Sequence, residues 1–188
     1  MHTDPPPDPL VLTPEQAAWL RLTMSARVGP AAMAQLLKVF GLPTAVFAAS
    51  QAALARVLGD TLARSLSGPP AEGIVRAIDI TRQWLQAGQQ RFLLTWADAD
   101  YPQALLATPD APPVLFGMGE RALLRTPMLA IVGARSSTRQ GEATATAFAQ
   151  SLAQAGLTIV SGLARGIDAA AHEGALAARA AGARASTV

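Results

Sequence analysis

Two short apolar runs in the second half of the chain are each followed by a glycine turn and a helical pattern. The runs cover residues 129–132 and 157–160, and their length and closing glycines predict buried strands. Apolar residues at helical spacing then predict a first helix whose buried face carries Ala145, Phe148, Ala149 and Leu152. A second helix, predicted over 167–182, has a face of mostly small residues: Ile167, Ala170, Ala171, Gly174, Ala175 and Ala178. The order strand, helix, strand, helix predicts a right-handed parallel crossover.

The first half of the chain shows only helical periodicity. Thr13 and Gln16 have the spacing of a capping box with Pro14 between them, so a helix is predicted to start there. A second helix is predicted to begin at Pro30 and to end at Gly41 and Pro43. Further helices are predicted around 54–58, 62–66 and 74–85, with a break at 67–70.

The two glycine turns predict an anion site. They read LAIVGARSSTRQG and TIVSGLARGID, so each joins a strand to a helix and carries an arginine. Backbone amides, a helix N-terminus and a guanidinium would meet there twice at one end of a parallel sheet, which favours a phosphate chain as ligand. A nicotinamide dinucleotide is disfavoured, because Gly-x-Gly-x-x-Gly is absent and the second strand ends in Ser161-Gly162 in place of an acidic residue.

At these turns the chain resembles the DNA-processing protein A (DprA, or Smf) family. The residues VGARSSTRQG at 132–141 resemble the family's V-G-S-R-x-x-T-x-x-G element, and SGLARGIDAAAH at 161–172 its S-G-x-A-x-G-I-D-x-x-A-H element. YPQAL at 101–105 and PPVLFG at 112–117 resemble two further family elements. Ala134 replaces a common serine, and Arg165 replaces a common lysine while keeping the positive charge.

The resemblance implies a cytoplasmic protein that binds single-stranded DNA and helps to load RecA recombinase in natural transformation or recombination. It implies no catalysis, no cofactor, no metal and no membrane attachment. Asp168, at the expected start of the second helix, is predicted to cap that helix and to order the loop. The residues predicted to bind phosphate are Gly133, Arg135, Ser136, Thr138, Gly141, Ser161, Gly162, Arg165 and Gly166.

The predicted fold class is α/β. Residues 1–10 form a disordered tail, 11–89 a helical domain of SAM or helix-hairpin-helix type, and 90–188 an incomplete Rossmann-like parallel-sheet domain. The turn at 27–30 resembles half of a helix-hairpin-helix but has only Gly29 where two glycines are usual, which favours a packing role.

The chain is expected to be truncated, since only four strands are predicted after residue 90 and 185–188 resembles the start of another. The family's homodimer surface would then lie beyond residue 188. This fragment is therefore expected not to dimerise, and to be less soluble and to bind DNA less tightly than a longer version.

Charge and cysteine content agree with this reading. Residues 111–188 hold 7 Lys and Arg against 4 Asp and Glu, whereas 1–110 hold 8 against 9, so the positive excess lies with the glycine turns. The absence of cysteine excludes disulfides and thiolate metal sites. The three tryptophans precede the turns and are predicted to pack in the core.

Two alternatives remain open from the residues alone. A nucleotide phosphoribohydrolase also uses a Rossmann-like phosphate site, but it would need a catalytic carboxylate in a glycine-rich motif, and this sequence does not show one. The other alternative is a protein-interaction module. It predicts that changing Arg135 and Arg165 together causes no loss of any ligand.

Overall fold

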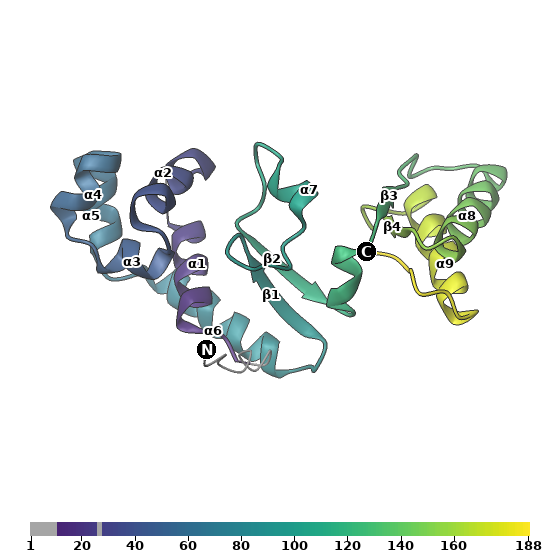
Figure 1. Cartoon of the computed structure of the whole chain (residues 1–188), viewed down its shortest axis with the longest axis horizontal. Coiled ribbons are helices and arrows are strands. Elements are labelled where there is room, and N and C mark those ends of the chain that lie inside the picture. The colour runs from purple at the N-terminus through teal and green to yellow at the C-terminus, as the bar shows by residue number, and fades with distance from the viewer. Residues whose placement is uncertain (1–10, 26–27) are drawn as a thin grey trace, which may run out of the picture. The chain divides into compact units, whose positions relative to one another are not determined.

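The computed structural model describes residues 11–25 and 28–188, which form two compact units (Figure 1). The first unit ends at Gly119 and the second begins at Glu120. The predicted tail at 1–10 and Arg27 of the predicted turn lie outside the described residues. The domain border predicted after residue 89 lies within the first compact unit. That border stays a prediction.

The first unit starts with six helices, and local signals account for most of their ends. They are α1 (Pro14–Met24), α2 (Pro30–Phe40), α3 (Pro43–Ala48), α4 (Gln51–Leu58), α5 (Asp60–Ser67) and α6 (Glu72–Gln86). The capping box is confirmed, because Thr13 and Gln16 each bond to the backbone amide of the other. The prediction that the second helix ends at Gly41 and Pro43 is confirmed, because α2 ends at Phe40 with Gly41 as its cap. Pro43 also opens α3, at a position where its missing N–H costs nothing.

A core of large apolar side chains holds these helices together. Trp19 and Leu22 of α1 are buried together with residues of the next four helices, among them Leu36, Val46 and Leu54. The Trp19 and Trp96 rings meet edge to face with centroids 5.9 Å apart. The prediction of a core role is therefore confirmed for Trp19, which is 2% exposed.

Strands β1 (Arg91–Thr95) and β2 (Val114–Met118) form an antiparallel pair in the first unit. The short helix α7 (Gln103–Leu106) lies between them in the chain. The four strands predicted after residue 90 therefore do not form one parallel sheet, because β1 and β2 pair with each other and with no other described strand. Leu93 instead packs against the helices, in a buried cluster with Leu12, Leu20 and Leu85.

The second unit holds the predicted strand-helix repeat. Its elements are the 3-10 helix η1 (Arg121–Arg125), β3 (Met128–Ala130), α8 (Arg139–Gln154), β4 (Thr158–Val160) and α9 (Ile167–Ala180). Strands β3 and β4 are parallel, as predicted. Thr187 adds a parallel bridge to Ile159 on β4, which confirms that the chain returns to the sheet after α9. Strand β4 therefore has neighbours on both sides.

Helices α8 and α9 pack closely because the residues between them are small. The alanines at 149, 153, 171, 175 and 178 are fully buried around Ile159. At Gly174 a Cβ atom would lie 2.1 Å from the Thr146 carbonyl oxygen, so no other residue fits without movement. The predicted small-residue face of the second helix is thereby confirmed.

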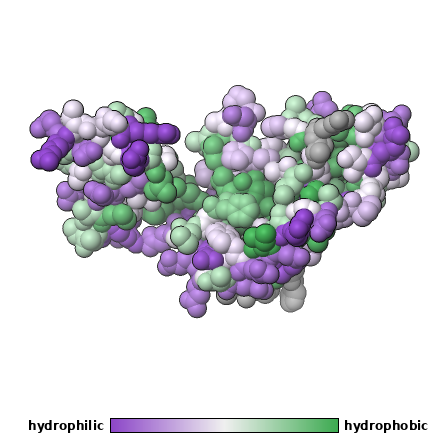
Figure 2. Space-filling model, turned by 180° about the vertical axis from the view of Figure 1, so that it is seen from behind, coloured by the Kyte–Doolittle hydropathy of each residue, from purple (hydrophilic) through white to green (hydrophobic). Residues whose placement is uncertain are grey.

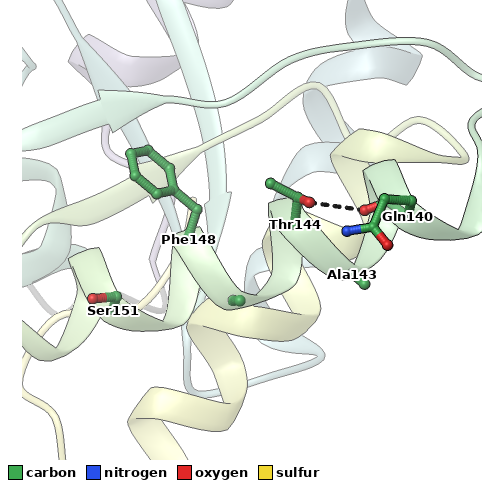
Figure 3. Close-up of a pocket in the computed structure, with 6 residues that line it drawn as sticks. Gln140, Ala143, Thr144, Phe148 and Ser151 are labelled. Carbon is green, nitrogen blue, oxygen red and sulfur yellow. Dashed lines mark hydrogen bonds between the residues drawn. The ribbon is translucent and has the colours of Figure 1, made fainter.

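The outer side of α8 departs from the prediction at one residue. Phe148 was expected on the buried face but is 58% exposed, and it projects from the helix beside Thr144 and Ser151 (Figure 3). The buried residues of α8 are Ala145, Ala149 and Ala153, so the face that α8 buries is narrower than the predicted apolar face.

The surface mixes polar and apolar residues. Figure 2 shows hydrophobic (green) and hydrophilic (purple) residues next to one another on the face in view. In β2, Phe116 and Met118 are exposed. No helix among the described residues is long and apolar enough to cross a membrane.

Candidate nucleic-acid interface

The first loop (residues 133–138) and the second loop (residues 161–166) are held together by one carboxylate. The Gly133 amide donates to Asp168 Oδ1 over 3.3 Å, and the Gly162 amide donates to Asp168 Oδ2 over 3.1 Å. Asp168 is 6% exposed, so these bonds are shielded from water. The prediction that Asp168 caps α9 is wrong, because the cap position is Gly166 and Asp168 lies inside the first turn. Its carboxylate orders both loops instead.

Glycines allow the two loops to touch. A Cβ atom on Gly166 would lie 2.3 Å from the Ala134 carbonyl oxygen, and the φ of Gly166 is +81°, which favours glycine. The Ile167 amide donates to that same carbonyl over 3.3 Å. A Cβ atom on Gly133 would lie 2.8 Å from Ile167. Both glycines are therefore required by the contact between the loops, whether or not a ligand is bound.

Most of the hydroxyls predicted to meet phosphate have partners within the protein. Thr138 caps α8, with its Oγ1 accepting from the Gly141 amide over 3.1 Å. Ser161 Oγ donates to the Ile131 carbonyl over 2.7 Å and so joins the ends of β3 and β4. Ser136 is exposed and has no hydrogen bond to any residue that the structure describes. Of the three predicted hydroxyls, Ser136 is thus the one left open to a ligand.

The two loop arginines face solvent. Arg135 and Arg165 are exposed, and neither forms an ion pair within 11–25 and 28–188. An Arg135–Asp168 pair, which would have explained the arginine without a ligand, is absent from this part of the chain, and the carboxylate is bonded to the two amides. The N-termini of α8 and α9 follow the loops directly and add partial positive charge. Each loop therefore carries a guanidinium that has no ion-pair partner among the described residues.

A hollow of about 330 Å³ beside the second loop marks where the positive surface ends. Its lining includes Arg139 and Gly166 but also the carboxylates Glu142 and Glu173. Negative charge there disfavours a phosphate, so the lining of this hollow does not suit an anion.

Sequence reasoning missed Leu163 in the second loop. This residue has a φ of +55° and is 83% exposed. Nothing in the sequence signals either property, because a leucine between glycine and alanine carries no preference for left-handed backbone.

Comparison with known proteins places both halves of the chain. Residues 92–185 match the family described as DNA recombination-mediator protein A, and residues 13–57 match the DprA-like N-terminal HHH domain. Protein Smf of Escherichia coli (strain K12) is 44% identical over 102 residues, which cover 54% of this chain and 27% of that protein.

Two further relatives agree. Protein Smf of Synechocystis sp. is 35% identical over 170 residues, covering 86% of this chain and 41% of the relative. DNA processing protein DprA of Streptococcus pneumoniae is 39% identical over 121 residues, which cover 64% of this chain and 43% of that protein. The chain thus spans less than half the length of each of these relatives.

The fold is also that of a solved structure. The X-ray structure of DNA processing protein A from Streptococcus pneumoniae matches 94% of this chain and 56% of that chain, with a TM-score of 0.55 and 23% identity. This likeness shows the fold alone, whereas the family match covers half of the sequence and includes both loops. The chain therefore belongs to the DNA recombination-mediator protein A family, also called DprA or Smf.

Proposed function

We propose that this chain binds single-stranded DNA through its backbone phosphates at the two loops. The observation that carries the proposal is that one buried carboxylate fixes both loops while Arg135 and Arg165 remain exposed and unpaired within the described residues. A guanidinium suits phosphate because its donors form a planar fork. Ser136 and the N-termini of α8 and α9 supply further donors and partial charge.

The proposed cellular role is DNA processing in natural transformation or recombination. Relatives carry the names DNA processing protein DprA and Protein Smf, which supports this role. We further propose that the chain helps to load RecA recombinase onto the bound strand in the cytoplasm. The role is one of binding and not of catalysis. The amides of Gly133 and Gly162 already donate to Asp168, so in this proposal these glycines support the loops while the guanidiniums meet phosphate.

The test is the double substitution Arg135→Glu with Arg165→Glu, measured by fluorescence anisotropy with a labelled single strand. We expect binding to be lost because two attractive contacts become repulsive. In the matching Arg→Ala double variant, the slope of log affinity against log salt should fall by about 0.7 for each phosphate contact removed. Far-UV circular dichroism should be unchanged, since both side chains are exposed.

A second double variant, Arg56→Glu with Arg184→Glu, controls for net charge. It produces the same change in charge at exposed positions outside the loops, and we expect it to weaken binding only slightly. Equal affinity of the loop double variant and the unmodified chain would place the DNA site elsewhere. An equal loss of DNA affinity in both double variants would mean that net charge, and not the loop position, causes the effect.

A further inference from the structure

Leu163 is the most exposed large apolar residue in the part of the chain that the structure describes. Its exposed fraction is 83%, compared with 74% for Met118 and 71% for Val132. Leu163 directly follows Gly162, whose amide is bound by Asp168. Val132 directly precedes Gly133, whose amide is bound by the same carboxylate. Two of the most exposed apolar residues therefore flank the point that joins the loops.

The backbone at Leu163 is strained. Its φ of +55° lies in the left-handed region, and within the described residues Leu163 is the one non-glycine residue with positive φ. A glycine would adopt this conformation without the clash that a Cβ atom causes. Packing does not explain the leucine either, because most of its side chain is in water. The residue thus contributes little to the fold while costing backbone strain, a combination that clusters at ligand-binding sites.

Single-stranded DNA has the apolar surface that would cover this side chain. The phosphates are charged and suit Arg165, two residues further along the same loop. The faces of unstacked bases are flat and apolar, and they gain from contact with apolar side chains. This argument rests on the proposed function, since it needs a strand at the loops.

We propose that Leu163 contacts the face of a nucleobase while the neighbouring guanidiniums hold the phosphates on either side. The second loop then presents two kinds of group to the strand: the apolar side chain of Leu163 and the cationic guanidinium of Arg165. Every nucleobase has an apolar face, so this contact favours unpaired DNA over duplex DNA without selecting a sequence.

The experiment compares Leu163→Gly with the unmodified chain on two strands of equal length. One is a mixed-sequence single strand, and the other is a fully abasic strand of the same backbone. Leu163→Gly keeps the left-handed conformation available, so the fold should be retained and the thermal midpoint should not fall. We expect about fivefold weaker binding of the base-bearing strand and unchanged binding of the abasic strand. Leu176→Ala, at an exposed position on α9, is the matched control and should alter neither affinity.

The outcomes separate this proposal from the proposed function. If Leu163→Gly binds the base-bearing strand as tightly as the unmodified chain, or loses affinity equally for both strands, the base contact is overturned while DNA binding stands. If the unmodified chain binds neither strand, the proposed function fails and the base contact fails with it. Selective loss on the base-bearing strand supports the contact.

Discussion

At the scale of single residues, Asp168 has the largest structural role in the candidate site. A carboxylate can accept bonds on both oxygens at once, and here each oxygen serves a different loop. No neutral side chain of similar size has two acceptor oxygens. The charge also favours bonds to backbone amides, which are stronger than those between neutral groups.

Asp168→Asn tests this role with minimal change in shape. The amide nitrogen of asparagine would face a backbone N–H, so one bond is lost and two donors oppose each other. We expect a loss of about 1–3 kcal/mol in the unfolding free energy of the second unit, because a buried donor is left unsatisfied. Single-stranded DNA should also bind less tightly, since the loops would no longer be fixed. Urea unfolding and anisotropy measure the two effects.

Glu173→Gln is the matched control for this substitution. It makes the same chemical change on the same helix at an exposed position, so the unfolding free energy should stay near that of the unmodified chain. Because Glu173 lines the hollow beside the second loop, its neutralisation should not weaken DNA binding. Unchanged unfolding and binding in Asp168→Asn would mean that the carboxylate is not needed to hold the loops.

At the scale of elements, local signals were sufficient where a single helix determines its own ends. The capping box at Thr13 and the glycine end at Gly41 were both predictable, because each depends on neighbours in sequence. The antiparallel pairing of β1 with β2 was not predictable, since a strand's partner lies far away in the chain. Phe148 shows the same limit, because periodicity identifies a face of a helix but not the width that its neighbour covers.

The contact between α8 and α9 provides an element-scale prediction. Gly174→Ala should improve intrinsic helix propensity by about 1 kcal/mol, yet its methyl group would meet the Thr146 carbonyl oxygen. We expect overpacking to prevail and to destabilise the second unit by about 1–3 kcal/mol. Urea unfolding followed by circular dichroism at 222 nm measures this change.

The same substitution in open space provides the control. Gly73 lies in α6, and a Cβ atom there would meet nothing within 4 Å. Gly73→Ala should therefore stabilise its unit by about 0.5–1 kcal/mol. The close-packing argument would be refuted if Gly174→Ala were as stabilising as Gly73→Ala.

At the scale of the whole molecule, the two units can be followed separately by spectroscopy. The chain has 3 tryptophans and 1 tyrosine, and all of them lie before Gly119. Tryptophan fluorescence therefore reports on the first unit, whereas circular dichroism reports on the helices of both.

This difference predicts how substitutions in each unit affect unfolding. Gly174→Ala should lower the midpoint of a transition seen by circular dichroism and leave the tryptophan transition in place. Leu54→Ala, which removes a fully buried side chain from the first core, should shift the tryptophan transition through a loss of about 2–5 kcal/mol. Coincident shifts by both probes in both variants would show that the units unfold together.

The shared carboxylate has a consequence for how the loops can vary. Because Asp168 lies between the loops, removal of its carboxylate breaks a bond to each of them at once. The bond from the Ile167 amide to the Ala134 carbonyl would then remain between the two segments. The substitutions that one loop tolerates should therefore depend on the sequence of the other loop, and changes in the two loops should be correlated.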